Sequence, residues 1–350
     1  MPMKFLIYGA YGYTGQLISK LAKAKGYSPI LAGRDEIKTQ SLANELELEY
    51  TSFDLSDSIK LEATLNKVDI VLHCAGPFSA TAKVMMEACI RTKTHYLDIT
   101  GEIEVFELGA SMDQVAKDAG ILIMPGVGFD VVPSDCLAAY LKLKLPDANH
   151  LELAFMSESS TSRGTALTMT QGIGKGGAIR KDGKIIPVPH AYRSRSLNLD
   201  GKEKSFVSIP WGDVSTAYYS TGIPNIMVYT AMHPGQIKKI KMVEKWRWFF
   251  NLSFVQNYLQ NKVRKTVTGP TEQMRENSRC YLWGEVKNDK GEIKSAKLTT
   301  LEGYKLTAIT SLMVIEEMIK ELPNPGYQTP SKAFGADFII KVENTNREDI

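Results

Sequence analysis

The sequence is poor in cysteine and carries little net charge. Its 350 residues include four cysteines, which lack the spacing of metal ligands or of a redox pair: Cys74, Cys89, Cys136 and Cys280. We therefore expect free thiols in a reducing, cytoplasmic compartment and no metal site. The formal net charge of +3 excludes no class of partner.

Long hydrophobic runs are missing as well. No run of about eighteen apolar residues occurs, which predicts that no helix crosses a membrane. A secretory signal is not expected either, because the apolar residues 3–8 lead at once into a glycine-rich turn. The length and the hydrophobic share of 43% are typical of a globular protein large enough for two domains.

That glycine-rich turn is the most informative segment of the chain. Its sequence is G-A-Y-G-Y-T-G, and a pattern of helical periodicity follows it through residue 23. Glycines allow a sharp turn and a close approach to a ligand, while a helix N-terminus favours negative charge. The spacing fits the dinucleotide fingerprint loosely, so a merely tight strand-to-helix turn is the alternative. We predict a pyrophosphate site that contains Gly9, Tyr11, Gly12, Tyr13, Thr14 and Gly15.

The second predicted strand, residues 28–34, ends in Gly33 and Arg34. In a Rossmann unit this position faces the adenosine ribose, where an acidic residue favours NAD and an arginine favours the 2′-phosphate of NADP. Gly33 leaves room for that phosphate. The sequence therefore favours NADP(H), with a surface arginine as the alternative. Asp54, after the third predicted strand, is a further candidate for cofactor binding.

Strands and helices continue to alternate through residue 130. Further strands are expected over residues 69–76, 95–99 and 121–124, which predicts an α/β fold with a Rossmann-type, doubly wound parallel sheet. Ligands bind such sheets beyond the carboxyl ends of the strands. The loops at these ends add cofactor-binding candidates with small or ring side chains: Ala75, Gly76, Pro77, Phe78, Gly126 and Gly128. Ordinary glycine and proline loops are the alternative for any one of them.

Several segments together resemble a known family. The chain is similar to the saccharopine dehydrogenase-like oxidoreductases, and within them to the trans-acting enoyl reductase branch. In the first part of the chain the resemblance rests on the glycine turn and on residues 31–34, 74–78, 96–102 and 125–135. It continues through residues 283–286, 299–310, 326–330 and 333–337, and it is weakest over about residues 181–265.

The resemblance implies a Rossmann domain that binds NADP(H) and a second α+β domain that covers the nicotinamide. It also implies reduction of a carbon–carbon or carbon–nitrogen double bond. In the enoyl reductase branch the substrate is a lipid acyl chain, and in saccharopine reductases proper it is an amino-acid imine. This chain shows no obvious cluster of arginines for a substrate with several carboxylates. A third alternative is an NADP(H)-binding sensor without turnover.

We expect the cofactor domain over residues 1–147 and a substrate and dimerisation domain over residues 148–326. A tail over residues 327–345 is expected to return to the first domain. The second domain is expected to contain strands over residues 151–156, 195–209 and 224–231, a hairpin around residues 289–291, and a long helix over residues 304–322. A homodimer is the default expectation.

Reduction of a double bond needs a hydride from the cofactor and a proton for the neighbouring atom. By position, Asp98 and Asp130 are the candidate catalytic acids, with Ser134 and Tyr13 as further proton donors. Each aspartate has a loop-capping or ribose-binding role as its alternative. Arg163, at a helix start capped by Ser162, is the candidate anchor for an anionic group of the substrate, the alternative being an exposed arginine.

Residues 236–268 combine positive charge with large apolar side chains. Eight basic residues stand against one acid, Glu244: Lys238, Lys239, Lys241, Lys245, Arg247, Lys262, Arg264 and Lys265. Such a pattern is typical of a helix on an anionic membrane surface or over a lipid-binding cleft. The alternative is a helix packed on the core or at a dimer interface, with solvated lysines. No nucleic-acid-binding module accompanies the charge.

Overall fold

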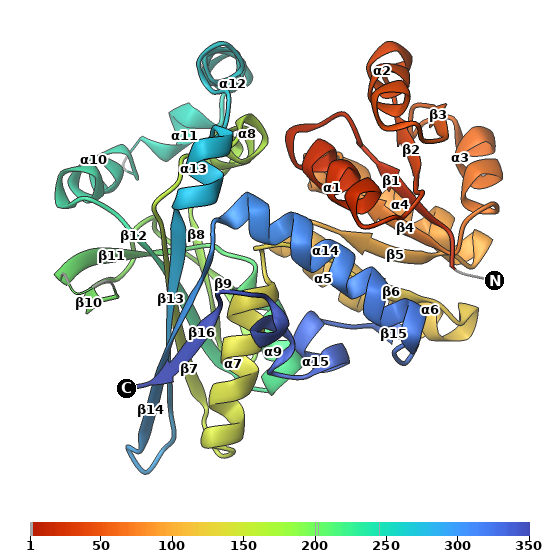
Figure 1. Ribbon diagram of the computed structural model, residues 1–350. Coiled ribbons are helices and arrows are strands. Elements are labelled where there is room, and N and C mark those ends of the chain that lie inside the picture. Colours follow the sequence, from red (N-terminus) through yellow and green to blue (C-terminus); the bar gives the residue numbers. More distant parts are fainter. Residues whose placement is uncertain (1–2, 200, 202, 245) are drawn as a thin grey trace. The chain divides into compact units, whose positions relative to one another are not determined.

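A computed structural model describes residues 3–199, 201, 203–244 and 246–350 (Figure 1). The chain divides into two compact units, both of them discontinuous in sequence. Unit 1 comprises Met1–Val132 and Tyr304–Val342, and unit 2 comprises Pro133–Gly303 and Glu343–Ile350. Each unit is built around its own sheet.

The sheet of unit 1 is parallel, with the strand order β3-β2-β1-β4-β5-β6-β15. The strands are β1 (Phe5–Tyr8), β2 (Ile30–Gly33), β3 (Tyr50–Ser52), β4 (Ile70–His73), β5 (His95–Asp98), β6 (Leu122–Met124) and β15 (Gly326–Tyr327). The order reverses between β1 and β4, which is the arrangement of dinucleotide-binding folds. The prediction of a Rossmann-type parallel sheet is therefore confirmed.

Helices cover both faces of this sheet, so its central strands are apolar on both sides. Leu6, Ile7, Val71 and Leu72 are fully buried. The helices of the amino-terminal part are α1 (Tyr13–Ala24), α2 (Glu36–Leu46), α3 (Ser58–Leu65), α4 (Phe78–Thr92), α5 (Ile103–Ser111) and α6 (Asp113–Ala119). The carboxyl-terminal part adds α14 (Gly303–Lys320), α15 (Pro330–Phe334) and the short helix η1 (Phe338–Lys341).

The division of the chain differs from the boundaries expected at residues 147 and 326. The first segment of unit 1 ends at Val132, and its second segment begins at Tyr304, so that α14 belongs to unit 1. The reason lies in two hydrogen bonds between α14 and the loop after β6. The Thr310 hydroxyl donates to the Val127 carbonyl at 2.8 Å, and the Phe129 N–H donates to the Thr307 hydroxyl at 2.9 Å.

Unit 2 has a mixed sheet with the order β10-β11-β12-β7-β13-β14-β16, to which β8 and β9 attach beside β12. Its strands are β7 (His150–Ser157), β8 (Gly177–Lys181), β9 (Lys184–Val188), β10 (Ser194–Asn198), β11 (Glu203–Ile209), β12 (Asn225–Ala231), β13 (Arg279–Lys287), β14 (Ile293–Leu301) and β16 (Asn346–Asp349). Its helices are α7 (Val132–Lys144), α8 (Arg163–Gly172), α9 (Asp213–Thr221), α10 (Pro234–Glu244), α11 (Arg247–Phe250), α12 (Ser253–Thr266) and α13 (Glu272–Asn277). This unit is α+β, as the resemblance implied.

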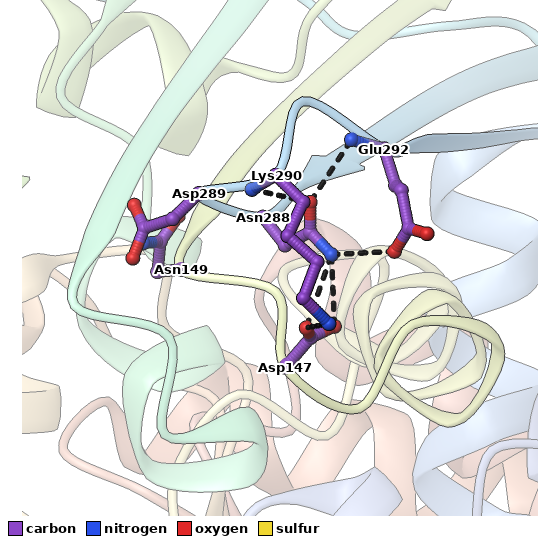
Figure 2. Close-up of polar contacts among 6 residues, drawn as sticks. All are labelled: Asp147, Asn149, Asn288, Asp289, Lys290 and Glu292. Atoms are coloured by element: carbon purple, nitrogen blue, oxygen red, sulfur yellow. Dashed lines mark hydrogen bonds and ion pairs between the residues drawn. The ribbon is translucent and has the colours of Figure 1, made fainter.

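The expected hairpin of unit 2 is present as β13 and β14, and one side chain holds its turn in place (Figure 2). Asn288 is buried, and its amide nitrogen donates to the Asp147 carboxylate at 3.1 Å and to Glu292 at 2.6 Å. Its amide oxygen accepts from the N–H groups of Lys290 and Glu292 at 3.1 and 2.9 Å. The side chain thereby joins the hairpin to the segment between α7 and β7.

The basic and aromatic segment forms α10, α11 and α12. Crossing a bilayer takes about 20 apolar residues, and none of the helices among the described residues reaches that combination of length and apolar character. The large side chains of the segment lie at the surface, since Trp246, Trp248, Phe254 and Tyr258 are 59 to 68% exposed. These rings are therefore not buried within the chain, and the membrane surface, the lipid-binding cleft and the dimer interface stay predictions.

Candidate cofactor-binding site

The turn between β1 and α1 requires glycine at two positions. Gly9 has φ +84°, and a Cβ there would lie 2.8 Å from the amide nitrogen of Ala75. A Cβ on Gly15 would collide with the carbonyl oxygen of Gly9 and lie 2.9 Å from that of Ala10. The Gly9 N–H donates to the Ala32 carbonyl at 2.8 Å, which fixes the turn on β2. Both glycines are therefore required by the close packing of the chain against itself in this turn.

Helix α1 begins at Tyr13, directly after this turn. Gly12 is its N-cap, no side chain caps its first N–H groups, and no acidic residue lies in its first turn. A helix N-terminus of this kind attracts an anion through its N–H groups and its dipole. Thr14 is in the same turn of α1, and the Tyr13 ring meets the Tyr304 ring edge-on at 5.1 Å. The geometry suits the predicted pyrophosphate site.

Two cationic side chains stand at the carboxyl end of β2. Arg34 is exposed and has no ion pair or hydrogen bond within the described part of the chain. Lys38 follows four residues later in α2, where it pairs with Asp35 at 2.7 Å. The Tyr11 ring packs over Gly33, 2.5 Å from the point where a Cβ would be. Lys38 was not singled out from the sequence. Its position four residues after Arg34 was the feature of the sequence that could have pointed to it.

Asp54, just after β3, has a local role in the structure. Its carboxylate accepts hydrogen bonds from the N–H and the hydroxyl of Ser56 at 3.0 and 2.8 Å. These bonds, with a smaller contribution from Arg34, hold the pKa of Asp54 below its usual value. Asp54 therefore closes the turn after β3, and its contact with a cofactor stays a prediction.

The loop after β4 contains Ala75, Gly76, Pro77 and Phe78, and α4 starts within it. Its partner is Glu102 from the loop after β5, whose carboxylate accepts from the N–H groups of Phe78 and Ser79, both at 2.9 Å. A carboxylate at this place stabilises the N-terminus of α4. Nothing in the sequence had singled out the role of Glu102, because the contact joins segments 24 residues apart.

Asp98 is fully buried at the end of β5. Its carboxylate accepts hydrogen bonds from the Tyr96 hydroxyl at 2.6 Å and from the N–H groups of Thr100 and Gly126, both at 2.9 Å. Burial raises the pKa of Asp98 to about 7, although the hydrogen bonds by themselves would lower the pKa. The arrangement favours the loop-capping alternative for Asp98, and its catalytic role stays a prediction.

The loop after β6 is packed tightly on its neighbours. Gly126 has φ +75°, and a Cβ there would lie 2.6 Å from the Phe106 ring, while a Cβ on Gly128 would lie 2.7 Å from the Thr307 methyl group. The Asp130 carboxylate lies against Gly101, at the place a Cβ would take. Asp130 therefore lies beside the loop after β5.

Contacts between neighbours thus join the loops after β1, β4, β5 and β6. Gly9 contacts Ala75, the Glu102 carboxylate binds the start of α4, and Asp98 binds the Gly126 N–H. Because these loops all follow the carboxyl ends of parallel strands, they gather at one edge of the sheet. The predicted cofactor candidates are brought together in unit 1.

Two other candidates belong to unit 2. Ser134 lies buried in the first turn of α7. Asp213, another buried residue of unit 2, has its pKa raised to about 8 by burial. Arg163 starts α8, and its Nε donates to the Val267 carbonyl at 3.0 Å. Ser162 caps this helix as expected, accepting from the Thr165 N–H at 3.2 Å. The roles of Ser134 and Arg163 in catalysis stay predictions.

Residues 5–124 match the sequence model of the family described as the saccharopine dehydrogenase NADP binding domain. The prediction of NADP(H) as the cofactor of this NADP-binding domain is thereby confirmed.

The chain is also similar in sequence to several curated proteins. A saccharopine dehydrogenase-like oxidoreductase from Rattus norvegicus is 25% identical over 217 residues, which are 54% of this chain and 51% of the relative. A lipid droplet localized protein from Caenorhabditis elegans is 26% identical over 239 residues, 59% of this chain and 55% of the relative. The trans-acting enoyl reductase of Mycobacterium leprae is 31% identical over 138 residues, 37% of this chain and 33% of the relative. The matches thus span about half the length of these relatives, or less.

Among solved structures, apo saccharopine dehydrogenase (L-Glu forming) from Saccharomyces cerevisiae shares the fold of the whole chain. Its TM-score is 0.70, and the alignment covers 99% of this chain and 100% of the yeast chain. The sequence identity is 13%, so the likeness concerns the fold alone.

Proposed function

We propose that the chain is an NADPH-dependent reductase that saturates the carbon–carbon double bond of an enoyl, lipid-like substrate. The observation that carries the proposal is the NADP-binding domain with its joined loops at one sheet edge. The M. leprae relative, named for enoyl reduction, supports the choice of substrate class.

The residues of unit 1 fit the cofactor. The uncapped start of α1, directly after the turn at Gly9, would receive the pyrophosphate through the N–H groups of its first turn. Arg34 and Lys38 would bind the 2′-phosphate, which carries the charge that distinguishes NADP from NAD. The bound cofactor supplies a hydride.

The proposed reaction adds two hydrogens in different forms. The hydride from the cofactor bonds to one carbon of the double bond as its π electrons shift, and a proton then bonds to the neighbouring carbon. Asp98 is fully buried within its hydrogen bonds, so Asp130 and Tyr13 are better candidates for the proton donor. Water is the remaining source of this proton.

Two arginines of unit 2 are already engaged within the chain, which argues against their binding a substrate with several carboxylates. Arg180 is buried and donates to the carbonyls of Val214 and Gly183 at 2.8 and 2.7 Å. Arg195 pairs with the carboxylates of Glu152 and Glu285. Breaking these buried or partly buried contacts would cost binding energy, so these guanidinium groups are poorly placed to hold an acidic amino-acid substrate.

The test is to mix the protein with NADPH and with separate enoyl thioesters, imines and ketones, and to follow the absorbance of the reduced nicotinamide. We expect the absorbance to fall with a long-chain enoyl thioester and the saturated thioester to form. Oxidation with imines alone would instead assign an amino-acid-type dehydrogenase. Saturable NADPH binding without oxidation of any compound would favour a sensor.

A further inference from the structure

Unit 2 presents a surface that combines exposed rings with positive charge, which we name the α10–α12 patch. Its large apolar side chains are 36 to 68% exposed: Met242, Trp246, Trp248, Phe249, Leu252, Phe254 and Tyr258. Among the described residues, every exposed tryptophan and phenylalanine lies in this patch. Water-exposed aromatic side chains gathered in one place mark a binding surface.

The same patch carries cations that the chain itself does not neutralise. These residues are exposed and form no ion pair within the described part of the chain: Lys238, Lys239, Lys241, Lys262, Arg264 and Lys265. Lys245 adds a charge to this segment but lies outside the described residues, and Glu244 is the one acid of residues 236–268. The segment has a net charge of 8 − 1 = +7, and the rest of the chain has 3 − 7 = −4.

Helical spacing places rings and charges on one side of α12. Phe254 and Tyr258 are four residues apart, and Lys262 and Lys265 continue the same face by one and two further turns. The other side of the helix carries Gln256, Leu259 and Val263, which are half-buried, and Val255 at its edge is buried. The outward face of α12 is thus aromatic at its start and basic at its end.

Helix α12 and the residue Asn251 before it are anchored to the body of unit 2, beside α8 (Figure 1). The Asn251 amide donates to the Gly174 carbonyl at 2.8 Å. The Gln256 amide donates to the carbonyls of Phe250 and Thr170 at 2.7 and 3.3 Å. Edge-on ring contacts of Phe249 with Trp248 and Phe254 hold the aromatic side chains together. The exposed rings are therefore presented from a fixed scaffold.

We propose that the α10–α12 patch docks the protein on the surface of an anionic lipid bilayer. The rings enter the boundary between headgroups and acyl chains, and the lysines lie over the anionic headgroups. Charge complementarity selects this occupant, because a net +7 segment would repel a second copy of itself across a symmetric interface. The proposal goes beyond the proposed function, and it holds whether or not the chain reduces an enoyl substrate.

The test is co-sedimentation of the whole chain with vesicles made of equal parts of phosphatidylcholine and phosphatidylglycerol, and with vesicles of phosphatidylcholine alone. We expect binding to the anionic vesicles that weakens as salt is added, because salt screens the attraction. Lys262→Glu/Lys265→Glu should weaken it about tenfold or more. Lys181→Glu/Lys184→Glu, the same charge change at exposed positions of the β8–β9 hairpin, should change it far less.

The aromatic part of the patch has its own pair of variants. Trp248→Ser/Phe254→Ser should abolish most of the vesicle binding, whereas Leu143→Ser/Ile293→Ser removes exposed apolar side chains elsewhere in unit 2 and should leave it intact. Circular dichroism is the check that each variant is folded. The proposal would be overturned if the Trp248/Phe254 variant and the Leu143/Ile293 variant lost vesicle binding equally. It would also be overturned if the unchanged protein did not sediment with anionic vesicles. A dimer in ultracentrifugation that the Trp248 and Phe254 changes dissociate, without vesicle binding, would assign the patch to a second copy.

Discussion

The Asp98 carboxylate accepts a hydrogen bond from the Gly126 N–H at 2.9 Å, across 28 residues of sequence. This bond joins the ends of β5 and β6, which are adjacent in the sheet of unit 1. The same oxygen also accepts from the Thr100 N–H, and the second oxygen accepts from the Tyr96 hydroxyl. One buried acid therefore sets the shape of two loops that contribute to the candidate cofactor site.

Asp98→Asn should change how stability depends on pH. Burial raises the pKa of Asp98 from its ordinary 3.8 to about 7, so between these values the folded chain holds a proton that the unfolded chain releases. Its contribution to the free energy of unfolding therefore falls as pH rises through this window, by about 1.4 kcal/mol per unit, and levels off above it. Asparagine does not titrate, so urea unfolding of the variant from about pH 4 to pH 8 should show a flatter decline.

The control for this experiment is Asp54→Asn. The pKa of Asp54 is lowered, so its titration falls below the window, and the variant should keep the decline of the unchanged protein. If Asp98→Asn keeps that decline as well, Asp98 is ionised in the folded chain throughout the window.

Gly9→Ala should abolish NADPH binding and destabilise unit 1 by about 3 to 5 kcal/mol, because it adds a collision with Ala75 to an unfavourable φ. Gly26→Ala is the matched control, since Gly26 has nearly the same φ, +85°, and open space around it. It should cost about 1 to 2 kcal/mol and leave binding unchanged. Thermal unfolding and calorimetric titration with NADPH measure both quantities, and equal losses in the two variants would disprove the role of the Gly9–Ala75 contact.

Arg34→Gln should weaken the binding of NADPH by about 10- to 100-fold, since a charge-assisted contact to the 2′-phosphate is lost. NADH, which lacks that phosphate, should bind the variant as before. Lys38→Gln should give a smaller effect of the same kind, because Lys38 is also paired with Asp35. Lys60→Gln, at an exposed lysine of α3, is the control for the loss of one positive charge elsewhere in unit 1. An equal loss for NADPH and NADH would remove Arg34 from the phosphate site.

Asn288→Ala should destabilise unit 2 by about 1 to 3 kcal/mol, because it removes a buried side chain that makes hydrogen bonds to Asp147, Lys290 and Glu292. NADPH affinity should not change, since Asn288 belongs to unit 2 and the cofactor candidates to unit 1. Asp289→Ala, at an exposed residue of the same turn, should have little effect. Unfolding followed by tryptophan fluorescence reports on this unit, because Trp211, Trp246, Trp248 and Trp283 all belong to it. No difference between the two variants would contradict the role of Asn288.

Local patterns were enough to predict most of unit 1. Alternating apolar runs and helical periodicity predicted the parallel sheet, and the glycines at Gly9 and Gly15 predicted the tight turn between β1 and α1, because both depend on a few adjacent residues. The helix start at Ser162 was predicted for the same reason.

Contacts between distant segments could not be read from these patterns. The capping of α4 by Glu102 and the grouping of α14 with unit 1 depend on residues far apart in sequence. Aromatic spacing on α12 suggested burial as readily as exposure, and only the structure shows that Phe254 and Tyr258 face solvent. Lys38 was missed although its position four residues after Arg34 was visible in the sequence, and its closeness to the Tyr11 ring appears only in the structure.

The discontinuity of unit 1 has a consequence for the nascent chain on the ribosome. Its sheet is completed by β15, and α14 holds the loop after β6, yet both come after the whole of residues 133–303. While those residues are still being translated, the free edge of β6 remains open to pairing with other strands. The sheet of unit 1 is therefore complete only after most of the chain has been synthesised.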